Sequence, residues 1–120
     1  MKRILIADPD SASRKALSLL LTKKLGLLDI LEAGDSETLI RTLADCPLDI
    51  LLLDWKLYGA PAPETCSLLL KAYPGLKIVL LSIDVDDWLA AQVVGAGFIH
   101  KGSTPGDVLA ILKPLLSSHE

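Results

Sequence analysis

The stretch Asp49-Ile-Leu-Leu-Leu-Asp54 decides the fold class of this chain of 120 residues. A continuous apolar run between two acids is typical of a strand that is buried on both faces, as strands are at the centre of a parallel sheet. Three other strand-like apolar runs lie at residues 3–7, 77–81 and 97–100. A polar residue follows each of the four runs directly, and these residues are Asp8, Asp54, Ser82 and Lys101.

Strand-like and helix-like segments alternate five times along the chain. The predicted strands are residues 2–7, 27–31, 49–53, 77–81 and 97–100. Helices are predicted at 11–25, 36–45, 66–73 and 87–94, and a last one begins after Thr104 as its N-cap. Five such units joined right-handedly predict an α/β fold, a doubly wound (βα)5 three-layer sandwich around a parallel sheet. With no internal linker in the pattern, residues 1–120 are predicted to form a single domain.

The four polar residues are candidates for one site. In an open α/β sheet, ligands bind outside the carboxyl ends of the strands, so these side chains should converge on one rim. Each residue alone has a simpler interpretation, because Asp and Ser often cap helices and Lys is usually a surface charge. Four polar groups at four strand ends, with none inside the strands, favour a site.

Composition excludes several classes of function. A formal net charge of -3 provides no long-range attraction for nucleic acid, so this domain is not expected to contact DNA directly. The apolar run at the amino terminus is too short for a signal peptide, and no stretch approaches a membrane span, which predicts a cytoplasmic protein without membrane contact. Cys46 and Cys66 lack the CxxC spacing of zinc sites.

The rim residues, together with the stretch Gly95-Ala-Gly-Phe-Ile-His-Lys101, resemble the receiver domain of two-component response regulators. The resemblance runs from about Lys2 to Leu116, and its short matches fall in order at the expected strand ends. It implies the flavodoxin-like sheet order 2-1-3-4-5. It also implies a function: a sensor histidine kinase or phosphotransfer protein passes a phosphoryl group to the domain, which then acts as a switch and not as an enzyme.

The resemblance assigns roles to four residues of the site. Asp54 matches the phosphoacceptor, whose carboxylate attacks phosphorus to give an acyl phosphate. Lys101 matches a lysine suited to phosphoryl or carboxylate oxygens, and we expect its ammonium group close to the Asp54 carboxylate. Ser82 matches the hydroxyl that donates to the phosphoryl group, and Phe98 matches the aromatic ring that repacks when this hydroxyl moves.

The metal ligands that the resemblance implies are incomplete. The family uses Mg²⁺, and the matching ligands are Asp8, Asp54 and the backbone carbonyl of Lys56. Receivers normally carry a second acid next to the first, but here Pro9 holds that position and has no side-chain oxygen. Asp10 follows one residue later and is either a displaced ligand or the N-cap of the first helix. We therefore expect weak binding of Mg²⁺.

Two interpretations of function follow from this asymmetry. The loop after Asp54 also departs from the family, with Tyr58 and two prolines within residues 59–64. The chain is either a working phosphoacceptor with reduced metal affinity or a phosphorylation-independent pseudo-receiver that acts as a protein-interaction module. A small flavodoxin-like ligand-binding protein is a third, weaker class. The output of a receiver would be a partner, a homodimer or a further domain.

Overall fold

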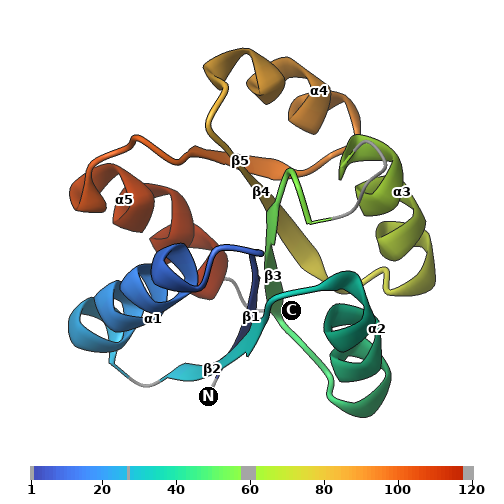
Figure 1. The fold of residues 1–120 in the computed structure, drawn as a ribbon, viewed down its shortest axis with the longest axis horizontal. Coiled ribbons are helices and arrows are strands. Elements are labelled where there is room, and N and C mark those ends of the chain that lie inside the picture. Colours follow the sequence, from blue (N-terminus) through green and yellow to red (C-terminus); the bar gives the residue numbers. More distant parts are fainter. Residues whose placement is uncertain (1, 27, 58–61, 118–120) are drawn as a thin grey trace.

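Strands and helices alternate along the chain in the computed structural model, which describes residues 2–26, 28–57 and 62–117 (Figure 1). The strands are β1 Lys2–Ala7, β2 Leu28–Ala33, β3 Ile50–Asp54, β4 Lys77–Ser82 and β5 Gly97–His100. The helices are α1 Ser11–Leu25, α2 Ser36–Asp45, α3 Ala62–Ala72, α4 Trp88–Val93 and α5 Pro105–Leu116, with a 3₁₀ turn at Val85–Asp87. Within these ranges, no helix has both the length and the apolar character that a membrane span requires.

The described strands form one parallel sheet in the order β2-β1-β3-β4-β5. This order confirms the flavodoxin-like arrangement expected from the sequence. The chain starts near the middle of the sheet, builds one edge through β2, and returns past β1 to build the other edge. All strands therefore present their carboxyl ends at the same rim, where loops and helix starts are free to form a site.

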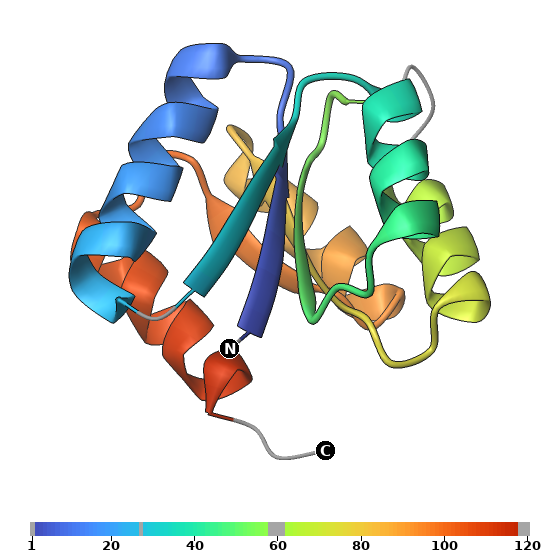
Figure 2. The same ribbon diagram turned by 90° about the horizontal axis from the view of Figure 1, so that it is seen from below.

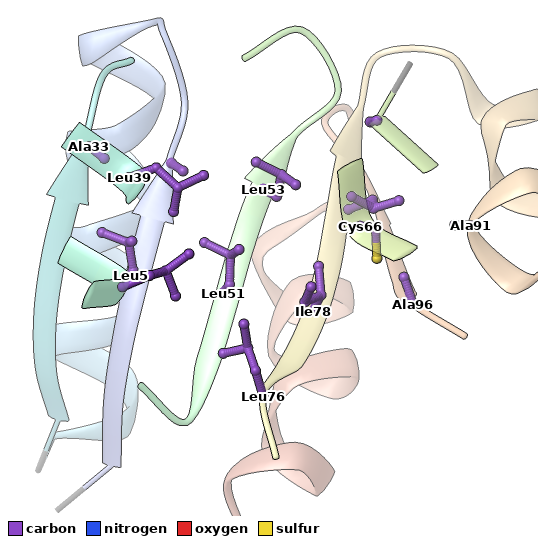
Figure 3. Close-up of a cluster of buried hydrophobic side chains, with 14 residues drawn as sticks. Leu5, Ala33, Leu39, Leu51, Leu53, Cys66, Leu76, Ile78, Ala91 and Ala96 are labelled. Atoms are coloured by element: carbon purple, nitrogen blue, oxygen red, sulfur yellow. The ribbon is translucent and has the colours of Figure 1, made fainter. Parts of the chain in front are cut away.

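Helices cover both faces of the sheet, which gives the three layers (Figure 2). On one face, α1 and α5 pack Leu21, Val108 and Leu112 against strand residues such as Ile50 and Leu52. On the other face, Leu39 of α2, Cys66 of α3 and Ala91 of α4 join the alternate strand residues Leu5, Leu51 and Leu53 in one apolar cluster (Figure 3). The sandwich thus has two apolar cores, one on each side of the sheet.

Strand β3 lies at the centre of this arrangement. It pairs with β1 on one side and β4 on the other, and all five of its residues are buried. Successive side chains of a strand point to opposite faces, so Leu51 enters one core and Leu52 the other. This accounts for the continuous apolar run in the sequence.

Five elements differ in their bounds from the sequence prediction. Two of them are α3, which is Ala62–Ala72 and not 66–73, and β4, which is Lys77–Ser82 and not 77–81. Strand β2 covers 28–33 and not 27–31, because its pairing with all six residues of β1 extends it, and Leu27 lies outside the described residues. Strand β3 includes Asp54, which pairs with Leu81 of β4. The predicted helix at 87–94 is a 3₁₀ turn followed by the short helix α4, because the Asp84 side chain accepts a hydrogen bond from the Asp86 N–H and starts the turn earlier.

Helix termini follow the predicted signals. The Thr104 hydroxyl caps α5 by accepting a hydrogen bond from the Asp107 N–H at 3.2 Å, and Pro105 begins the helix. Gly26 and Gly95 follow α1 and α4 with positive φ angles of 71° and 80°, which glycine adopts without strain. Of the loop after β3, residues 58–61 lie outside the described ranges.

Candidate functional site

The four rim residues meet in one cavity at the carboxyl ends of the strands. Asp8 follows β1, Asp54 ends β3, Ser82 ends β4 and Lys101 follows β5. All four line a cavity of about 430 Å³. Asp8, Asp54 and Ser82 are among the buried polar residues, with 1 %, 5 % and 3 % of their surfaces exposed. The sheet order has therefore brought together the residues that the sequence pattern singled out.

Lys101 joins the two buried acids. Its Nζ lies 2.7 Å from Asp8 Oδ2 and 2.5 Å from Asp54 Oδ2, so one ammonium group bridges both carboxylates. Burial by itself lowers the pKa of Lys101, but the hydrogen bonds and charges of Asp54 and Asp8 outweigh it and the pKa is raised. The expected contact between Lys101 and Asp54 is present, and the lysine remains a cation at neutral pH.

Backbone N–H groups hold the other oxygen of each acid. Asp8 Oδ1 accepts a hydrogen bond from the Asp10 N–H at 2.9 Å, and Asp54 Oδ1 accepts one from the Lys56 N–H at 2.8 Å. In addition, the Trp55 N–H donates to the carbonyl of Leu81 at 2.8 Å, which continues the pairing of β3 with β4 beyond Asp54. These contacts fix the orientation of both carboxylates before any ligand arrives.

Ser82 makes its side-chain contacts with the turn that follows β4. Its hydroxyl donates to Asp87 Oδ2 at 2.6 Å and accepts a hydrogen bond from the Asp84 N–H at 3.0 Å. Sequence reasoning missed Asp87, because an acid five residues after a strand reads equally well as part of a helix start. Three acids within residues 84–87, close to a serine at a strand end, are the signal that could have marked Asp87 as a candidate.

Phe98 lies apart from the cavity. It is partly buried in β5, opposite Leu80 of β4, and packs against the core that α2, α3 and α4 cover. Phe98 does not line the cavity that holds Ser82. Its predicted role as a switch therefore concerns packing behind the site and not contact with a ligand.

Asp10 caps α1. Its Oδ1 accepts from the Ala12 N–H at 3.0 Å, and its Oδ2 accepts from the Ser13 hydroxyl at 3.3 Å. The hydrogen bond from the Ala12 N–H is the main cause that lowers the pKa of the Asp10 carboxyl, and hydrogen bonds from Ser13 add to it. Asp10 also lines the cavity, but both of its oxygens are engaged with the helix. Of the two interpretations left open by the sequence, the structure shows the N-cap.

The residues at the rim offer a limited set of metal ligands. Asp8, Asp54 and the backbone carbonyl of Lys56 provide hard oxygen donors, while Pro9 lines the cavity without a side-chain oxygen. Mg²⁺ binds proteins through one or two carboxylates and keeps several waters, so this set fits Mg²⁺. Across the described residues, no group of three or more His, Cys, Asp or Glu side chains is arranged to hold a metal. The few protein ligands thus suit a Mg²⁺ ion that keeps most of its water ligands.

Arg14 supports the loop that carries Asp8. Its Nη1 donates to the backbone carbonyl of Asp8 at 2.7 Å, and its Nε lies 3.2 Å from Glu32 Oε1 on β2. A Cβ atom at Gly34 would lie only 2.9 Å from Arg14 Nη1, so the glycine leaves room for the guanidinium group. The sequence analysis did not single out Arg14, because its partner Glu32 lies on strand β2, 18 residues further along the chain.

Comparison with known proteins gives a family and a fold. The family model described as response regulator receiver domain matches residues 4–113. Response regulator UvrY of Escherichia coli K12 is 22% identical over 120 residues, which are 98% of this chain and 55% of that protein. Transcriptional activator protein ExaE of Pseudomonas putida is 27% identical over 119 residues, 97% of this chain and 56% of that protein. The chain spans about half the length of these curated relatives.

Solved structures resemble the whole fold. A CheY-like receiver domain protein from Methanospirillum hungatei JF-1 superposes with a TM-score of 0.82 at 24% identity, over 97% of this chain and 94% of that one. The signal receiver domain of a DNA-binding response regulator from Colwellia psychrerythraea 34H gives a TM-score of 0.88 at 17% identity, over 98% and 100% of the two chains. At these identities the likeness concerns the fold.

Proposed function

Because the chain belongs to the response regulator receiver domain family of two-component systems, we propose that it accepts a phosphoryl group on Asp54 and switches a downstream output. The donor is a sensor histidine kinase or a phosphotransfer protein. The observation that carries the proposal is the position of Asp54 in the cavity, where it is buried at the end of the central strand and bonded to Lys101. A buried carboxylate that is paired with a lysine ammonium group suits a nucleophile, because the same cation can balance the charge of the phosphoryl group.

The transfer follows from the groups that surround Asp54. An oxygen of its carboxylate forms a bond with phosphorus while the bond from phosphorus to the donor imidazole nitrogen breaks, and that nitrogen keeps the electron pair. Lys101 stays protonated, because its pKa is raised, and its ammonium group can pass from Asp54 Oδ2 to an oxygen of the phosphoryl group. The Lys56 N–H holds the other carboxylate oxygen. The protein thus positions groups and balances charge.

Asp8, Asp54 and the Lys56 carbonyl would hold Mg²⁺ in the proposed site. When bound, the ion supplies positive charge beside the phosphoryl oxygens. The absence of an acid at Pro9 and the engagement of Asp10 with α1 favour weak binding. Weak affinity would raise the concentration of Mg²⁺ that phosphorylation requires.

Ser82 and Phe98 are proposed to convert phosphorylation into a change of shape. The Ser82 hydroxyl turns to an oxygen of the phosphoryl group, and the Phe98 ring repacks in the space beside β4. Large apolar side chains are exposed along the segment that would respond, and these are Ile83, Val85, Trp88, Leu89 and Val93. A surface of this kind favours a protein partner or a second copy of the chain as the output contact.

A cytoplasmic location, where kinase and donor are available, fits the proposed function. We propose that this signalling domain acts as a switch without an external substrate of its own. With a net charge of -3 it is not proposed to touch nucleic acid, even though one curated relative is named a transcriptional activator. Any DNA contact would belong to another part of such a protein.

The test is phosphorylation by a small donor. Incubation with acetyl phosphate and Mg²⁺ should add one phosphoryl mass to the protein, and Asp54→Asn should abolish the addition. Asp45→Asn is the matched control, because Asp45 is exposed at the end of α2 and does not line the cavity. Label that persists in Asp54→Asn would refute the assignment. No label in the unmodified protein at any Mg²⁺ concentration would favour the phosphorylation-independent pseudo-receiver.

A further inference from the structure

The Ser82 hydroxyl already donates a hydrogen bond in the unphosphorylated protein. It has one proton, and that proton lies in a 2.6 Å hydrogen bond to Asp87 Oδ2. A hydroxyl bonded to a carboxylate at this distance is in the stronger class of hydrogen bonds. Ser82 is 3 % exposed, so water competes weakly for the contact. A phosphoryl group on Asp54 could receive this proton only after Asp87 releases it.

The turn after β4 brings Asp87 back to Ser82. Asp84 begins the turn by accepting a hydrogen bond from the Asp86 N–H, and the Asp87 N–H donates to the Asp84 carbonyl at 3.1 Å. Asp87 occupies the position before α4 where a side chain commonly caps the helix, but it makes no capping hydrogen bond. Its carboxylate is directed to Ser82 instead of to the helix that follows.

We infer that Asp87 is a positioning residue that holds Ser82 in the off state and so sets the threshold of the switch. The inference rests on the proposed function, because it requires a phosphoryl group on Asp54. Asp87 and Asp54 line the same cavity, so phosphorylation adds negative charge near a carboxylate that is already there. Repulsion of Asp87 and attraction of the Ser82 hydroxyl then act in the same direction.

Release of Asp87 also connects the site to the surface. Asp87 ends the 3₁₀ turn and directly precedes Trp88, the first residue of α4. When the carboxylate leaves Ser82, the turn loses one of its two hydrogen bonds to the Ser82 hydroxyl and keeps the one from the Asp84 N–H. The exposed Val85 and Trp88 side chains on this turn and helix are then free to shift, which is where an output contact would sense the change.

The test measures how tightly the site binds a phosphoryl mimic. Beryllofluoride is titrated at saturating Mg²⁺ and followed by the fluorescence of Trp55, which lines the cavity. Asp87→Ala should tighten binding by about tenfold, the low end of the range for a hydrogen bond to a charged group. Asp87→Asn keeps the size of the side chain without its charge and should give a smaller gain. Thermal melting verifies that each variant folds.

Two controls separate this role from a general effect of charge. Asp86→Ala removes an exposed acid from the same turn, and its side chain is not the one that Ser82 contacts, so binding should change by less than about twofold. In a Ser82→Ala background, Asp87→Ala should give a much smaller gain, because only the direct repulsion between Asp87 and the mimic remains. Equal gains from the two acids, or a full gain without Ser82, would overturn the inference.

The outcome also distinguishes the inference from the proposed function. If the unmodified protein binds beryllofluoride no better than Asp54→Asn does, the proposed function fails, and the role of Asp87 as a threshold fails with it. If the unmodified protein binds and Asp87→Ala binds no more tightly, only the role of Asp87 is overturned.

Discussion

At the scale of single residues, the Lys101 ammonium group explains how two buried acids are tolerated side by side. Carboxylates rarely lie in the interior unless they are paired, and here one cation serves both Asp8 and Asp54. A third acid in the same place would require an additional cation. The natural protein has Pro9 at the position from which such an acid would come.

Restoring that acid tests the account of the metal site. Pro9→Asp should tighten Mg²⁺ binding by roughly tenfold, because a third carboxylate raises the charge of the ligand set. Without the ion, the three acids repel each other, so the free energy of unfolding should fall and recover as Mg²⁺ is added. Trp55 fluorescence titrated with Mg²⁺ measures the first effect, and urea unfolding with and without Mg²⁺ measures the second.

Pro9→Ala is the matched control for this change, since it removes the rigid ring without adding an acid. Its Mg²⁺ affinity should stay close to that of the natural protein. If Pro9→Asp also leaves the affinity unchanged, then Asp10 or water already completes the site, and the explanation based on Pro9 is wrong. Faster phosphorylation together with tighter binding would identify the natural protein as a receiver with reduced metal affinity.

At the scale of elements, strand β3 carries the proposed phosphoacceptor and packs against the helices on both faces of the sheet. It ends at Asp54, and its side chains enter both cores. Any loosening of β3 therefore reaches the phosphoacceptor as well as the layers of helices. The rim keeps its geometry because the strand beneath it is held on four sides, by β1, by β4 and by the two helical layers.

Truncation of one leucine in β3 should show how strongly the stability of the domain depends on this strand. Leu52→Ala is expected to lower the free energy of unfolding by about 2–5 kcal/mol, because the residue is fully buried and leaves a cavity. Leu68→Ala on α3 is the control: its side chain is 68 % exposed, and the expected change is about 0.5 kcal/mol or less. Urea unfolding followed by circular dichroism compares the two. A similar loss in both variants would contradict the central role of β3.

At the scale of the whole molecule, stability should fall as the pH becomes alkaline. Burial raises the pKa of the Cys66 thiol from 9.0 to about 11, and Asp54 and Asp8 raise the pKa of Lys101 against the effect of burial. A group whose pKa is higher in the folded state stabilises the fold fully below its unfolded pKa and loses that contribution as the pH rises. The Cys66 contribution is therefore expected to disappear between pH 9.0 and about 11.

Urea unfolding measured from pH 7 to pH 11 checks this expectation. Cys66→Ala will be less stable at neutral pH because of the cavity, but its stability should decline less steeply above pH 9.0 than that of the natural protein. The comparison of slopes removes the cavity term, which does not depend on pH. Parallel curves for the two proteins would show that folding does not raise the pKa of the Cys66 thiol.

The sequence by itself determined the layers and the place of the site. Hydrophobic periodicity and apolar run length are local properties, and they located the strands and the residues Asp8, Asp54, Ser82 and Lys101 at the strand ends. The parallel sheet then placed all four at one rim, since parallel strands share one carboxyl edge. The boundaries of β2 escaped prediction, because its length depends on pairing with β1.

Only the tertiary structure decided which partner each polar group takes. Asp10 could have faced the cavity or α1, and the hydrogen bonds of Ala12 and Ser13 engage it at the helix. Ser82 could have faced Asp54, and the turn at 85–87 engages it with Asp87 instead. A hydrogen bond exists only within a few tenths of an ångström of its optimum length, and such distances arise from the packing of segments that sequence patterns describe one at a time.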